Sequence, residues 1–206
     1  NFISLLELVE NSENIGLDID DKMIKDALTQ SASKIIDEEF LQEYQNVFYN
    51  LKEADILDVH FIEIYKLIGA LQPEKYHPEG DAYNHSILAL KKSAEITKDE
   101  KIRFSALVHD LGKGVTPKSE YPHHINHDEN GVAEVIKMGK RLKLPTSWIK
   151  CGITAAKEHM KGGIFYKMTP NKQVEFIERI CKTTIGLYGL EIVVEADRNC
   201  RGTKKD

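Results

Sequence analysis

Apolar residues recur along the chain at spacings of three and four, which is the pattern of helices that bury one face. In the first part of the chain this pattern covers residues 2–9, 23–28 and 37–51, where Asp37 is the expected N-cap of the last helix. The remaining segments repeat the same spacing, so the sequence predicts an all-α fold.

A loop over residues 69–80 interrupts the helical pattern, because it holds two prolines and two glycines. His77 in this loop is expected at the surface, although it could reach a site. The loop predicts an N-terminal helical region, residues 1–70, and a main domain, residues 71–206, packed as one unit. In the main domain, apolar spacing and capping residues predict helices over 81–97, 99–110, 127–142, 145–159, 169–180 and 187–197.

Composition narrows the class of protein. The 206 residues are 41% hydrophobic and 30% charged, which fits a globular domain and argues against disorder and membrane residence. The net charge of −5 argues against a sequence-blind nucleic-acid coat protein but is compatible with a small phosphorylated ligand. Three widely separated cysteines without a CxxC pair indicate buried thiols and a cytoplasmic location.

The strongest chemical signal lies in residues 106–114, where an apolar run ends in adjacent His109 and Asp110 and then in Lys113 between two glycines. Burying a carboxylate costs several kcal/mol unless a cation or donors compensate it, and a bound metal would do so. Gly112 and Gly114 would end the helix and let the backbone approach a ligand. The alternative is structural, with His109 capping the helix and Asp110 paired with Lys113.

Two helices joined by a short turn should bring His85 close to His109, because the first begins beside the point where the second ends. Three further helices carry His127, His159 and Asp197 at their ends. In the histidine cluster over 123–127, His127 is the preferred ligand and His124 the alternative.

Each of these residues also has a simpler explanation. The histidine cluster could be a solvated, pH-sensitive loop, and a terminal histidine often only hydrogen-bonds exposed carbonyls. Asp197 could form an ion pair with Arg198 or Arg201. Taken together, however, four imidazoles and two carboxylates suffice for one divalent metal, or for two that share a carboxylate. Such mixed ligands suit Mn, Fe, Co, Ni or Zn better than calcium, and Mg is compatible.

The order of these motifs resembles the HD superfamily of metal-dependent phosphohydrolases, with His85, then His109-Asp110, then Asp197, each on its own helix. More closely, the chain resembles the HD region of bacterial tRNA nucleotidyltransferases, the CCA-adding enzymes. That likeness covers roughly residues 55–202 and rests on the segments 76–85, 109–114, 127–131, 158–159 and 195–202. It implies an HD-domain helical bundle with extra N-terminal helices.

Those enzymes also carry a nucleotidyltransferase head, with a glycine-rich strand turn and paired aspartates. No such pattern stands in these 206 residues. Nucleotide addition is therefore not expected of them alone, whether they are a fragment of a longer nucleotidyltransferase or a separate relative of its HD region.

The resemblance implies a site and a reaction. Metal-activated hydroxide would attack phosphorus, because a metal lowers the pKa of water from about 15.7 toward about 7. Asp110 and Lys113 would be the catalytic residues, with Lys113 stabilising charge on the phosphoryl oxygens. A first divalent ion would be held by His85, His109, Asp110 and Asp197, and a second by His127 and His159 with Asp110 as the bridge. Substrate would contact Lys113, His124, Arg198 and Arg201.

The implied substrates are phosphate esters such as 2′,3′-cyclic phosphates, 2′-nucleotides or small phosphomonoesters. The 3′ end of tRNA is the implied macromolecular partner, and no membrane is expected. The alternative function is a non-catalytic helical module that binds tRNA or a protein partner. Retention of His85, His109, Asp110 and Asp197 disfavours that alternative, because a vestigial site would usually have lost a ligand.

Overall fold

The computed structural model describes residue 48, residues 51–52 and residues 57–200. The helices predicted over 2–9 and 23–28 lie outside the described residues, as does most of the helix predicted over 37–51. Its described residues Phe48 and Leu51 are helical and buried. The described residues contain no strand, and their one β pairing is an isolated antiparallel bridge between Leu71 and Asp81. The predicted all-α fold is confirmed.

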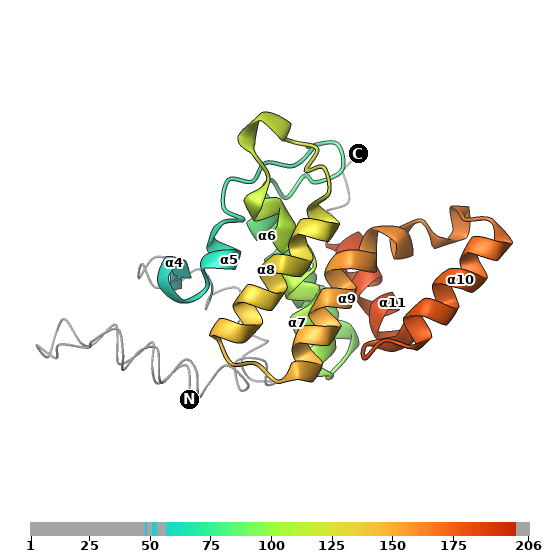
Figure 1. Ribbon diagram of the computed structural model, residues 1–206. Coiled ribbons are helices and arrows are strands. Elements are labelled where there is room, and N and C mark those ends of the chain that lie inside the picture. Colours follow the sequence, from blue (N-terminus) through green and yellow to red (C-terminus); the bar gives the residue numbers. More distant parts are fainter. Residues whose placement is uncertain (1–47, 49–50, 53–56, 201–206) are drawn as a thin grey trace, which may run out of the picture.

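The centre of the described structure is formed by α6 (Ala82–Ile96), α7 (Glu100–Val108), α8 (His127–Arg141), α9 (Thr146–Gly163) and α11 (Gly186–Asn199), while α10 (Pro170–Cys181) lies to one side against α11 (Figure 1). Within the described residues, no helix combines the length and apolar character that crossing a membrane requires. The α-helices are α4 (Leu57–His60), α5 (Ile62–Tyr65), α6 (Ala82–Ile96), α7 (Glu100–Val108), α8 (His127–Arg141), α9 (Thr146–Gly163), α10 (Pro170–Cys181) and α11 (Gly186–Asn199). Short 3-10 helices in the connections are η1 (Leu111–Val115), η2 (Lys118–Glu120) and η3 (Phe165–Lys167).

Two apolar clusters hold the helices together. The first joins α6, α7, α8 and α9 to the described residues before the loop at 69–80, including Phe48 and Leu57. The second joins α7 to α9, α10 and α11, with Ile180 and Val193 fully buried. Because α7 and α9 both contribute to both clusters, these two helices form the centre of the bundle. The domain boundary between residues 70 and 71 remains a prediction.

The starts of α6 and α7 follow the predicted capping. The Asp81 carboxylate accepts a hydrogen bond from the backbone N–H of Asn84 at 3.0 Å, and the Asp99 carboxylate accepts one from that of Lys101 at 2.9 Å. Side-chain caps of this kind satisfy backbone donors that have no partner within the helix. These two caps fix the helices that carry His85 and His109.

Two predicted helix ends were wrong. Helix α9 continues to Gly163 instead of ending at His159, because Gly162 lets it pass close to α11. A Cβ at position 162 would lie 2.8 Å from Cγ2 of Val194. Helix α7 ends at Val108, and the two glycines expected to end it lie in η1 instead.

Candidate metal centre

Helices α6 and α7 bring His85 and His109 together. His85 lies in the first turns of α6, and His109 is the C-cap residue of α7. The two helices contact each other, and the centroids of the two imidazole rings are 5.3 Å apart. The predicted proximity of these two histidines is confirmed.

Gly112 determines where α8 begins relative to Asp110. A Cβ at position 112 would lie 1.9 Å from the carbonyl oxygen of His127 and 2.6 Å from the backbone nitrogen of Gly131. Only a glycine therefore lets η1 lie directly on the first turn of α8. Gly131 in turn packs against α9, where its Cβ would be 3.2 Å from that of Ala156. These contacts bring the first turn of α8 and the His159 end of α9 toward Asp110.

Helix α11 supplies Asp197. One carboxylate oxygen of Asp197, Oδ1, lies 3.0 Å from Nε2 of His85 and 3.9 Å from Nε2 of His109. Helix α11 therefore directs the Asp197 carboxylate toward His85 and His109.

Asp110 lies at the centre of the cluster, and its side chain is 1% exposed. Its two oxygens face different groups of imidazoles. Oδ2 is 3.3 Å from Nε2 of His109 and 3.5 Å from Nε2 of His85, and Oδ1 is 3.4 Å from Nε2 of His159 and 3.5 Å from Nε2 of His127. We call His85, His109 and Asp197 the first set, and His127 and His159 the second set.

Three of the histidines are anchored to backbone carbonyls through Nδ1. His109 bonds the carbonyl of Ala106 at 2.7 Å and His127 that of His124 at 2.8 Å, while His159 contacts two carbonyls of the preceding turn at 3.0 Å. A carbonyl oxygen can only accept, so each Nδ1 carries the hydrogen. In the neutral ring, each Nε2 then presents a lone pair to the centre of the cluster, as in a metal ligand.

Burial and neighbouring charges set the pKa values in the cluster. Burial alone would raise the pKa of Asp110, but Lys113 and His109 hold that pKa well below its usual range. Burial lowers the pKa of both His109 and His127. Burial also opposes the charged form of His159, yet contact with the Asp110 carboxylate raises its pKa above the ordinary value. An ionised carboxylate thus lies among imidazoles, two of which are held neutral.

Lys113 is a buried part of the cluster and not a surface lysine. Its ammonium is 2.6 Å from Oδ2 of Asp110 and donates a hydrogen bond to Oε1 of Gln72 at 2.5 Å. The pairing of Asp110 with Lys113 therefore exists, as one contact within the larger cluster. His124 is also buried, and its Nε2 donates to the carbonyl of Leu71 at 2.8 Å.

Sequence reasoning missed Glu79, a buried carboxylate beside the first set. Its Oε1 accepts hydrogen bonds from Nδ1 of His85 at 2.7 Å and from Nδ1 of His77 at 2.8 Å. His77 is therefore buried, not at the surface as expected. Burial would raise the pKa of Glu79, but the hydrogen bonds from the two histidines lower it to about 2. Helical spacing gave no signal for Glu79, because it lies in a loop.

Cys151 and Cys200 are buried thiols, as predicted, but the prediction was wrong for Cys181, which is exposed. Cys200 also contacts the first set. Its Sγ donates to the carbonyl of Asp197 at 3.2 Å and lies 3.3 Å from Nδ1 of His85. Burial opposes the charged form of His85, but hydrogen bonding with Asp197, Cys200 and Glu79 raises its pKa well above the ordinary value.

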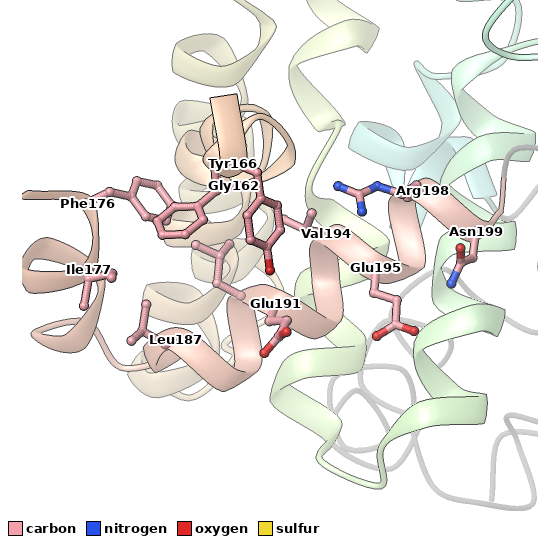
Figure 2. Close-up of a pocket in the computed structure, with 12 residues that line it drawn as sticks. Gly162, Tyr166, Phe176, Ile177, Leu187, Glu191, Val194, Glu195, Arg198 and Asn199 are labelled. Carbon is pink, nitrogen blue, oxygen red and sulfur yellow. The ribbon is translucent and has the colours of Figure 1, made fainter. Parts of the chain in front are cut away.

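Arg198 lies apart from these contacts. Its guanidinium donates to the carbonyl of Gly163 at 3.3 Å, and the residue lines a pocket of about 480 Å³ formed by the end of α9, η3, α10 and α11 (Figure 2). None of the residues that line this pocket belongs to the Asp110 cluster. Arg201 lies outside the described residues. The role of either arginine in substrate binding remains a prediction.

The cluster fits a divalent ion better than a self-sufficient polar core. Nε2 of His109, Nε2 of His127 and Oδ1 of Asp110 are buried and have no hydrogen-bond partner. Buried polar atoms of this kind cost free energy unless a donor or cation meets them. Among the described residues, potential ligand atoms lie within 4.8 Å of one another in three groups. Two belong to the cluster around Asp110, namely His85 with His109 and Asp197, and His109 with Asp110 and His159; the third joins His85 to His77 and Glu79.

These features define an all-α domain in which helix ends converge on a buried cluster of imidazoles and carboxylates suited to divalent metal. The sequence pattern of the HD domain matches residues 82–195, which are more than half of the chain. The chain belongs to the HD domain family.

Known relatives match the same part of the chain. It is 35% identical to the Multifunctional CCA protein of Legionella pneumophila (strain Paris) over 131 residues, which are 64% of this chain and 32% of that protein. It is also 35% identical to the Multifunctional CCA protein of Nitrosococcus oceani over 140 residues, which are 68% of this chain and 34% of that protein. The chain therefore spans about a third of the length of these curated relatives. No solved structure matches it.

Proposed function

We propose that this chain is a metal-dependent phosphohydrolase that cleaves phosphate esters with water. The single observation that carries the proposal is the Asp110 carboxylate, which is buried, ionised and flanked by imidazole Nε2 atoms at both oxygens. A structural ion pair needs only one cation beside a carboxylate, and Lys113 already supplies it. The additional ring of inward-facing imidazole nitrogens is explained by a metal.

In this proposal His85, His109, Asp110 and Asp197 hold one divalent ion, and His127 and His159 hold a second with Asp110 as the shared ligand. The ions would be Mn, Fe, Co, Ni, Zn or Mg. Bound there, a divalent ion supplies the positive charge that acidifies water and neutralises phosphoryl oxygens. Backbone carbonyls fix the imidazole orientations, so the ligand geometry exists before an ion arrives.

Lys113 is the proposed electrostatic catalyst. Its ammonium is held by Asp110 and Gln72 on one side of the cluster, 7% exposed, where a charge acts with little screening. A phosphoryl group beside the metal would meet this ammonium, which stabilises the negative charge on its oxygens. The net reaction converts an ester and water into an alcohol and a phosphate, or opens a cyclic phosphate to a monoester.

The proposed substrates are 2′,3′-cyclic phosphates, 2′-nucleotides and small phosphomonoesters. The relatives are CCA proteins by name, which supports the 3′ end of tRNA as the macromolecule that carries such a phosphate. A cytoplasmic location is part of the same proposal, since tRNA ends are found there. The absence of hydrolysis by a metal-loaded protein that still binds tRNA would favour the alternative, a non-catalytic binding module.

The test is hydrolysis by purified protein of 2′,3′-cyclic AMP and p-nitrophenyl phosphate with added Mn²⁺, Ni²⁺ or Co²⁺, together with metal analysis. Asp110→Ala should abolish hydrolysis and remove bound metal. The matched control is Asp58→Ala, because Asp58 is an exposed aspartate in α4, outside the cluster. Loss of activity in both variants, or retention in both, would overturn the proposed site.

A further inference from the structure

Two buried polar groups beside Lys113 take no part in holding the proposed metals, and each has one atom without a partner. These atoms are Nε2 of Gln72 and Nδ1 of His124. Both side chains are nearly inaccessible, with exposures of 7% and 2%. Gln72 bonds Lys113, and His124 bonds the carbonyl of Leu71, the residue next to Gln72. Buried polar groups normally pair, so two unpaired atoms in this part of the structure indicate a place for a ligand.

The chemistry of the Gln72 atom follows from its other contact. Oε1 of Gln72 lies 2.5 Å from the ammonium of Lys113. An ammonium can only donate, so the atom that faces it is the amide oxygen. The unpaired atom is therefore the NH₂ group, which is a donor and requires an acceptor from a ligand.

The chemistry of the His124 atom is the opposite. Its Nε2 lies 2.8 Å from the carbonyl of Leu71, so Nε2 carries the hydrogen. In the neutral ring Nδ1 is then an acceptor. The contact with Leu71 also places the ring on the residue next to Gln72. His124 stands at a φ of 48°, a backbone conformation that is uncommon outside glycine and is typical of functional positions.

We infer that Gln72 and His124 form a subsite for a hydroxyl group on the ester's alcohol side, next to the scissile phosphate. A hydroxyl satisfies both atoms, since it accepts from the amide of Gln72 and donates to Nδ1 of His124. A phosphate dianion has no hydrogen to donate, so it would leave His124 unpaired. The inference rests on the proposed phosphohydrolase function and specifies its substrate class as phosphate monoesters of vicinal diols.

This subsite ranks the proposed substrates. A 2′-nucleotide carries a free 3′-hydroxyl beside its phosphate and satisfies both residues. A 2′,3′-cyclic phosphate has an oxygen at that position but no hydrogen, so it satisfies Gln72 alone. p-Nitrophenyl phosphate has neither. A site that hydrogen-bonds a substrate hydroxyl rejects the analogue that lacks it by about 10-fold to 100-fold when one or two bonds are lost.

The test compares adenosine 2′-phosphate with 3′-deoxyadenosine 2′-phosphate, which differ by one oxygen atom. We expect kcat/KM and calorimetric affinity to favour the hydroxylated ester by at least about 10-fold in the wild type. Gln72→Glu keeps the oxygen that faces Lys113 and changes the free donor into an acceptor. His124→Phe removes the acceptor. Both variants should reduce the ratio toward one, whereas the control Gln173→Glu, which alters a glutamine bonded to the Phe165 carbonyl, should retain it.

The ratio is measured within each variant, so it does not depend on the folded fraction or on metal loading. A wild-type ratio near one, or a ratio that survives both substitutions, would overturn the inference even if hydrolysis is fast. If the protein hydrolyses no ester, the proposed function fails. In that case, calorimetry on the metal-loaded protein still tests the subsite, because the affinities for the two esters can be compared without hydrolysis.

Discussion

We predict that adding one methyl group at Gly112 shifts the second set of histidines relative to the first set. In Gly112→Ala the new Cβ would lie 1.9 Å from the carbonyl oxygen of His127 and 2.6 Å from the backbone nitrogen of Gly131. Both are backbone atoms, so no side-chain rotation relieves the clash. Either η1 or the first turn of α8 must move, and the distance between Asp110 and His127 changes with it.

The expected destabilisation lies at the upper end of the range for overpacking, about 3 kcal/mol. For a chain of this size each kcal/mol lowers Tm by about 2–4 °C, so Tm should fall by about 6–12 °C. The first set should survive, because none of its residues is on η1 or α8. Metal bound per folded protein should therefore decrease without disappearing.

Thermal unfolding followed by circular dichroism, with metal analysis of the folded protein, measures both effects. The matched control is Gly163→Ala, because a Cβ at position 163 meets nothing within 4 Å and the residue is helical. Alanine there should leave Tm unchanged or raise it slightly. If Gly112→Ala melts within about 2 °C of the wild type and keeps its full metal content, the packing argument for this glycine is wrong.

Three further outcomes are expected. His109→Ala should lose metal, whereas His60→Ala, at a buried histidine outside the cluster, should keep its metal per folded protein; equal losses would show that the site is misplaced. Glu79→Ala should weaken metal binding by about 10-fold to 100-fold, measured by chelator competition, and Glu79→Gln should weaken it less, because an amide oxygen can still accept from His85. Mn²⁺ at about 100 times its Kd should stabilise the metal-free protein by about 2.7 kcal/mol and raise Tm by about 5–11 °C, a shift that Asp110→Ala should lack.

The parts of the fold that could be predicted depend on neighbouring residues. The caps Asp81 and Asp99 and the apolar spacing behind them are local signals, and they placed α6 and α7 with His85 and His109 at adjacent ends. The end of α9 was wrong because glycine is a poor helix former on average, while packing against Val194 favours it at position 162. That contact joins residues far apart in the sequence, so no local pattern reveals it.

In the candidate site, too, local signals could be predicted and contacts between distant residues could not. The proximity of His85 and His109 was predicted, and both lie beside Asp110 and Asp197. Helix periodicity could not identify Gln72 and Glu79, because loop residues have no periodic face. Nor could it show which imidazole nitrogen faces inward, since backbone carbonyls decide that orientation only after folding.

The Nδ1 anchors of His109, His127 and His159 have a consequence for metal exchange. Each ring is hydrogen-bonded to a carbonyl three or four positions earlier in the chain, so it is held in place when the ion leaves. The helices around the rings are joined by apolar clusters and do not depend on coordination bonds. Unlike zinc fingers, which unfold without metal, this scaffold would release one ion and accept another with its shape unchanged. The bound ion would then be set by which metals are available in the cell and not by which metal was present when the chain folded.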